Sequence, residues 1–133
     1  MKRLAALAVA VVAFAAAATV LGAGSTPFGA AYKTVVTGQA PALNGTWRIV
    51  FTPAGAYTVT KQGTAGKLIV GKATSSGNRL VFRDSSGPLA CPGGKSGSYT
   101  WTLKGTKLTL KILKDVCAGR PLILAGAPFT KTG

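Results

Sequence analysis

The chain has 133 residues, of which 16 are Lys or Arg and only 2 are Asp or Glu, and it contains no His; its formal net charge is +14. General acid–base catalysis usually needs His or paired carboxylates, and a Ser-His-Asp or Cys-His site needs His, so we expect a protein that is not an enzyme. The same shortage leaves too few ligands for a metal site, and no cofactor is expected.

The first 24 residues have the pattern of a secretory signal peptide. Lys2 and Arg3 precede an apolar run from Leu4 to Leu21, and small residues follow at 22–24. We expect a signal helix here and cleavage between about residues 22 and 31. A retained membrane anchor is the alternative, because the run approaches the roughly 20 apolar residues that span a bilayer. The sequence thus predicts export, with membrane contact only through this segment before cleavage.

Beyond Pro27 short apolar–polar alternations are separated by Gly-rich turns, a pattern typical of antiparallel strands. Five such runs cover residues 32–36, 47–51, 57–59, 68–70 and 80–82. A Gly/Pro/Ser-rich loop over 85–97 follows them. The clearest hairpin comes next, with alternating runs at 99–103 and 108–112 across a short turn at Gly105. A final strand is expected from Pro121 to about Phe129, with Leu122 and Leu124 on one face.

These runs predict an all-β fold with about eight strands, in one domain over residues 32–131. Neighbouring strands should pair in chain order, because their connections are short. Closing the sheet removes both exposed edges, so we expect an eight-stranded antiparallel up-and-down barrel. A β-sandwich of two sheets is the alternative.

Cys91 and Cys117 are an even pair in a chain that we expect to be exported, so a disulfide is predicted between them. A reactive thiol is the alternative, but it would need an adjacent base or cation, and the chain has no His.

Gly45-Thr46-Trp47 stands at the head of a predicted strand. This Gly-x-Trp element resembles the first-strand motif of the calycin superfamily, which contains lipocalin-like and avidin-like barrels. The segments around Cys91 and from Lys107 to Arg120 are similar to small bacterial secreted proteins described as lipocalin-like. The chain is shorter than a typical lipocalin and shows neither its C-terminal helix nor its central motif. The resemblance covers residues 32–131 and implies an exported protein of a bacterial envelope or exterior.

The resemblance also implies a structural role for the end of the barrel. In calycins a basic residue near the last strands packs on the motif Trp and closes the barrel bottom, and Arg120 is the candidate to pack on Trp47. Asp115 stands five residues before Arg120, a position that favours a local salt bridge or a turn cap over a ligand-binding role.

Aromatic side chains on the inward positions are the candidate ligand-binding residues. These are Trp47, Phe51, Tyr57, Phe82, Tyr99 and Trp101. A barrel with such short strands can equally be filled by its own side chains, so a filled core and a ligand cavity both stay open.

Three binding functions follow from the residues. The first is a lipocalin-like protein for a small apolar or amphipathic ligand. The second is a cationic surface module, because the charge remains +12 once Lys2 and Arg3 are removed, and this charge attracts anionic envelope polymers or an acidic protein. The third is an inhibitor of extracellular enzymes that uses the 85–97 loop. Nucleic acid is not expected, because no aromatic residues clearly interleave with the lysines of 104–114 and export separates the protein from the genome.

Overall fold

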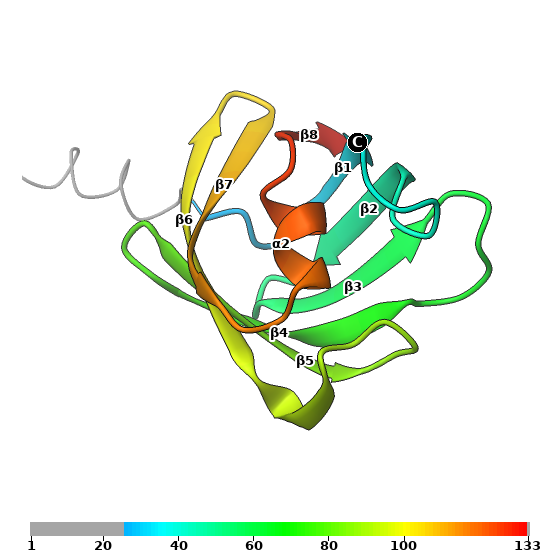
Figure 1. Ribbon diagram of the computed structural model, residues 1–133. Helices are drawn as coiled ribbons and strands as arrows, with labels where there is room; N and C mark the ends of the chain where they lie inside the picture. Colours follow the sequence, from blue (N-terminus) through cyan, green and yellow to red (C-terminus); the bar gives the residue numbers. More distant parts are fainter. Residues whose placement is uncertain (1–25, 133) are drawn as a thin grey trace, which may run out of the picture.

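The computed structural model describes residues 26–132, which form a closed barrel of eight antiparallel strands in chain order (Figure 1). The strands are β1 (Ala31–Val36), β2 (Gly45–Phe51), β3 (Ala56–Lys61), β4 (Ile69–Ser76), β5 (Arg79–Ser86), β6 (Ser96–Lys104), β7 (Lys107–Asp115) and β8 (Phe129–Thr132). The predicted up-and-down barrel is therefore confirmed, and the sandwich is not the fold. The predicted signal segment lies outside the described residues.

Alternating burial along each strand explains why this sequence closes into a barrel. In β1 the side chains of Tyr32, Thr34 and Val36 are buried while Lys33 and Val35 are exposed. In β5 the same alternation buries Leu80, Phe82 and Asp84. Because side chains on a strand point to opposite faces in turn, most apolar side chains of the strands face one common interior. The exceptions are Val35 in β1 and Ile112 and Leu113 in β7, which are each about half exposed.

The predicted last strand is wrong over most of its length. Residues 119–124 form a short helix, α2 (Gly119–Leu124), and β8 begins only at Phe129. The buried residues of α2 are Arg120, Ile123 and Leu124, which is the i, i+3, i+4 spacing of a helix and not the period of two of a strand. Pro121 lies in the first turn, where a backbone N–H has no partner within the helix, so the proline is tolerated.

Helix α2 fills the part of the barrel that its last strand leaves open. Strand β8 pairs with β7 only at Lys107 and Leu108, and with β1 only over Ala31–Lys33. Figure 1 shows α2 within the outline of the ring of strands, and its Ile123 and Leu124 belong to the buried core. Across residues 26–132, no helix has the length and apolar composition to cross a bilayer.

Candidate functional site

A buried ion cluster lies where α2 meets the barrel. The guanidinium of Arg120 donates to both oxygens of Asp115, from Nε at 2.7 Å and from Nη2 at 2.8 Å. Its Nη1 lies 3.6 Å from Oδ1 of Asp84 at the end of β5. The three side chains are almost completely buried, with 4%, 0% and 2% of their surface exposed for Arg120, Asp115 and Asp84. The local ion pair expected between Asp115 and Arg120 is thus present, and it is joined by Asp84, which the sequence did not point to.

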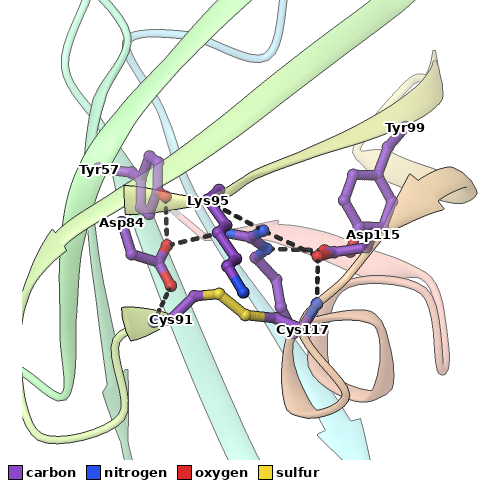
Figure 2. Close-up of a disulfide and its surroundings, with 8 residues drawn as sticks. Tyr57, Asp84, Cys91, Lys95, Tyr99, Asp115 and Cys117 are labelled. Carbon is purple, nitrogen blue, oxygen red and sulfur yellow. Dashed lines mark hydrogen bonds and ion pairs between the residues drawn. A yellow bond between two sulfur atoms is a disulfide. The ribbon is translucent and has the colours of Figure 1, made fainter. Parts of the chain in front are cut away.

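Four further donors complete the coordination of the two carboxylates (Figure 2). The Tyr57 hydroxyl donates to Asp84 at 2.5 Å, and the Tyr99 hydroxyl donates to Asp115. The backbone N–H of Cys91 donates to Asp84 at 2.8 Å, and that of Cys117 donates to Asp115 at 2.9 Å. Buried charges are tolerated when they are paired and hydrogen-bonded in this way. The cluster therefore ties strands β3, β5, β6 and β7 to α2.

The pKa values of Asp115, Arg120, Tyr57 and Tyr99 are shifted in directions that follow from the contacts of the cluster. Burial alone would raise the pKa of Asp115, but hydrogen bonds from Arg120, Tyr99 and the Cys117 N–H outweigh it and hold that pKa below its usual value. Burial also acts to lower the pKa of Arg120, but the Asp115 and Asp84 charges raise it overall. Burial and a carboxylate partner raise the pKa of both Tyr57 and Tyr99. All four groups thus keep one protonation state through the neutral pH range, which suits a structural role.

The two cysteines are held together by the same cluster. Their sulfurs are within bonding distance and their Cα atoms are 6.1 Å apart, in the usual range for a disulfide. Each cysteine N–H is bonded to one of the two aspartates, so the bridge and the ion cluster fix the same two chain segments. The bridge also anchors the loop between β5 and β6, which contains the short 3₁₀ turn η1 (Pro92–Gly94).

Most of the predicted ligand-binding aromatics form a packed core. Trp47, Phe51, Tyr57, Phe82 and Tyr99 are each at most 3% exposed. Their rings lie in edge and tilted contacts, with Phe82 centred 5.4 Å from both Tyr57 and Tyr99. The sixth, Trp101, is only partly buried, and its indole N–H has no hydrogen-bond partner among the described residues.

The space between the core residues and α2 is almost completely filled. The void between the core residues and α2 measures about 10 Å³ and is lined by Ile49, Phe82, Ile123 and their neighbours. A cavity needs about 10–15 Å³ to hold a single water molecule, so this one has no room for an organic ligand. The centre of the barrel is thus filled by its own side chains, and the larger hollow of about 240 Å³ lies at the end of the barrel beside the disulfide.

The Gly-x-Trp element occupies the end of the barrel near α2. Gly45 begins β2, and the Trp47 indole donates to the Leu43 carbonyl at 2.7 Å. The cation over the Trp47 ring is Lys61, whose Nζ lies 5.7 Å from the ring centroid. Arg120, expected from the resemblance to pack on this ring, has its polar contacts with Asp115, Asp84 and the Lys95 carbonyl.

The ion cluster has a consequence for the outer surface, because it uses every side-chain carboxylate of the protein. The sequence has two acids, Asp84 and Asp115, and both are in the cluster. Of its 16 Lys and Arg residues, Lys2 and Arg3 lie outside the described range and Arg120 is buried, which leaves 13 that reach the surface. The outside of the barrel thus presents 13 basic side chains and no acidic one over residues 26–132.

Seven of these cations line two broad grooves together with threonine side chains. The first strip, which we define as Lys33, Arg48, Lys61 and Lys67, borders an open groove of about 590 Å³ over β1, β2 and β3. The second strip, defined as Lys104, Lys107 and Lys111, borders an open groove of about 700 Å³ over β6 and β7. Thr46, Thr60 and Thr64 line the first groove, and Thr100, Thr102 and Thr109 line the second. Each groove can therefore offer both positive charge and hydroxyl donors to an anion.

Like charges face each other across neighbouring strands of this surface. Lys33 is opposite Arg48, Lys72 is opposite Arg83, and Lys104 is opposite Lys107. Directly opposed like charges destabilise a sheet. The fold accepts this repulsion at three places, and an anion bound between two such cations would relieve it.

Sequence reasoning found the general basic character and the outward row of Lys107 and Lys111 with Lys104 near its end, which is the second strip, but it did not group the members of the first strip. Their signal is the alternation itself, since Lys33, Arg48, Lys107 and Lys111 all stand at outward positions of predicted strands. Comparison of the chain with protein-family models, curated proteins and solved structures found no match.

Proposed function

We propose that this protein is a non-catalytic, exported binding module that holds anionic polymers of the cell envelope on the outside of a calycin-like barrel. The observation that carries the proposal is the confinement of both carboxylates to the interior, which leaves 13 surface cations without an acidic neighbour. Such a surface concentrates polyanions around it. The paired cysteines support export, because disulfides persist in oxidising compartments.

The filled interior favours the outer surface over a pocket as the binding site. Five of the six aromatic residues that could have lined a ligand cavity are buried in one packed core, and the remaining void between this core and α2 is about 10 Å³. The wide grooves of about 590 and 700 Å³ lie outside and are lined mainly by lysines, arginine and threonines, with Trp101 in the second groove. Linear polymers with repeated phosphate or carboxylate groups match this combination of breadth and charge.

The test is a binding titration of the purified protein with long-chain polyphosphate over a series of salt concentrations. We expect tight binding at low salt that weakens steeply with added salt, because a polymer bound through several cations releases its counterions. Neutral dextran is the negative control. Binding that does not respond to salt, or no binding at low salt, would overturn the proposal.

Two other probes in the same titration separate the sources of negative charge. Polyglutamate stands for an acidic protein, and vesicles containing phosphatidylglycerol stand for an anionic membrane. The proposal expects polyphosphate to compete with both for the protein. Binding to vesicles or polyglutamate without binding to polyphosphate would reject the polymer as the partner.

A small apolar ligand is the second candidate, and one observation favours it. A hollow of about 240 Å³ lies beside the disulfide at the end of the barrel, lined in part by Leu43, Ile69, Leu89 and Ile123. This volume is below the range of about 300–1,000 Å³ typical of ligand pockets. A fluorescent hydrophobic probe whose emission changes with wild type, but not with Leu89→Lys, would support this candidate.

A further inference from the structure

The two cationic strips lie on opposite sides of the barrel. The closed strand order runs from β1 to β8, so β2 and β6 are four strands apart in either direction around it. Figure 1 shows the β6–β7 hairpin and the β2–β3 pair on opposite sides of the ring, with α2 between them. Side chains that point outward from β2 and from β6 therefore point away from each other.

The strips are also displaced toward opposite ends of the barrel. Antiparallel strands in chain order place successive connections at alternate ends. The β3–β4 connection, next to Lys61 and Lys67, is thus at the end where α2 lies between β7 and β8. The β6–β7 turn, next to Lys104 and Lys107, is at the other end. One straight segment of a polymer can follow either strip but cannot follow both.

The barrel between the strips is rigid. Buried side chains, among them Trp47 and Tyr99, pack together in its interior, and the void between them and α2 is only about 10 Å³. The disulfide and the ion cluster fix the end of the barrel that contains α2. Close-packed interiors resist deformation, so the strips cannot turn toward a common ligand. Each strip keeps at least three cations and its own groove, and neither contains an acid that would repel a second polyanion.

We propose that the protein is bivalent and bridges two polyanion chains, or two distant segments of one chain. This inference rests on the proposed function, but it adds a property that a single binding face would not have. Bridging makes the protein a cross-linker of envelope polymers: near equal numbers of sites and ligands it joins chains into a network, whereas excess protein covers each chain separately.

The experiment mixes the protein with long-chain polyphosphate at low salt and follows light scattering as the ratio of protein to polymer changes. We expect scattering to pass through a maximum and to fall again with excess protein. Tripolyphosphate should compete for binding without producing scattering, because it is too short to connect two proteins.

Three variants, each with three positive charges removed, test whether the strips act as two sites. The first is Lys33→Gln/Arg48→Gln/Lys67→Gln, and the second is Lys104→Gln/Lys107→Gln/Lys111→Gln. The matched control is Lys72→Gln/Lys114→Gln/Lys131→Gln, which leaves both strips intact. We expect the first two to retain polyphosphate binding and to lose scattering, and the control to retain both. Circular dichroism verifies that each variant is folded.

The possible failures have different meanings. Equal loss of scattering in all three variants would show that total charge, and not two strips, causes the assembly, and would overturn bivalency. Wild-type protein that binds polyphosphate without scattering would overturn bivalency and leave the proposed function standing. Wild-type protein that does not bind at all would reject the proposed function itself.

Discussion

Inside the barrel, Arg120 faces two carboxylates, whereas on the outer surface Lys33 faces Arg48 and Lys104 faces Lys107. The inner cation is buried and paired with two carboxylates, although its Nη1 has no hydrogen bond among the described residues, and the outer cations are without a side-chain acid. The difference separates two roles of charge in one small domain. Interior charges hold chain segments in place, whereas most exterior cations repel one another and have no acidic partner within the protein.

The largest expected effect comes from removing the central cation of the interior cluster. We expect Arg120→Met to lower the free energy of unfolding by about 3–5 kcal/mol, because it leaves Asp84 and Asp115 buried without their counter-charge. The matched change on the surface, Arg48→Met, should alter stability by no more than about 0.5 kcal/mol. Urea unfolding measures both, and equal effects would contradict the division of roles.

Breaking the disulfide should have the next largest effect. The bridge closes a loop with a sequence separation of 26. Chain entropy then gives a loss of about 3–4 kcal/mol in Cys91→Ser or Cys117→Ser. We expect the two single variants and the double variant to be destabilised about equally, because each loses the same bond. Thermal or urea unfolding tests this, and single variants as stable as the parent would show that the bond is absent.

The interior cluster should also limit the pH range of the fold at both ends. The pKa of Asp115 is lower in the folded state than in the unfolded state, where it is about 3.9. Asp115 therefore stabilises the fold fully above a pH of about 3.9, and this stabilisation is lost as the pH falls through the folded pKa. The pKa values of Tyr57 and Tyr99 are raised in the folded state above the unfolded value of about 10. The two tyrosines therefore stabilise the fold fully below a pH of about 10, and this stabilisation is lost as the pH rises further. Urea midpoints measured from acid to alkaline pH should therefore fall at both extremes.

A tyrosine variant provides the control for the alkaline limb. Tyr99→Phe removes one of the two raised groups, so its stability should decline less steeply above pH 10 than that of the parent, in spite of a lower stability at neutral pH. If the free energy of unfolding of Tyr99→Phe fell with pH as steeply as that of the parent, ionisation of Tyr99 would not contribute to the alkaline loss of stability.

The smallest expected effect lies on the surface, where repulsion can be relieved. Lys33→Glu places an acid opposite Arg48, and we expect it to stabilise the barrel by about 0.2–1 kcal/mol. Lys33→Gln, which removes the repulsion without adding attraction, should give an intermediate gain. At high salt the parent and the two variants should have nearly equal free energies of unfolding, since exposed charges are screened. A loss of stability in Lys33→Glu would show that the paired cations are not under strain.

The barrel could be predicted from the sequence because apolar and polar residues alternate along its strands, as in residues 99–103. The helix at 119–124 could not, because it is only six residues long and a short apolar run such as Leu122–Leu124 fits a strand as well as a helix. The presence of a helix in place of a strand also changes the interior of the barrel. Helix α2 contributes Ile123 and Leu124 to the core, whereas a strand would have continued the barrel wall.

Of the contacts in the ion cluster, only the ion pair between Asp115 and Arg120, which are close in sequence, could be predicted. Asp115 and Arg120 are five residues apart, so their pairing needs little more than a turn. Asp84 comes from β5, and its contact with Arg120 depends on strand register and on the position of α2, which no local pattern encodes. The confinement of both acids, and with it the purely basic surface, therefore became visible only in three dimensions.

The confinement of both acids also gives experimenters unusual freedom with this protein. Replacing any of the 13 surface cations leaves no acidic side chain behind without its counter-ion, because no such side chain is outside. Substitutions at cations that do not face one another should then add independently, whereas those within the pairs Lys33/Arg48, Lys72/Arg83 and Lys104/Lys107 should be coupled. A ladder of variants can lower the net charge one unit at a time, in any order, on an unchanged barrel, and so count how many positive charges retention by an anionic matrix requires.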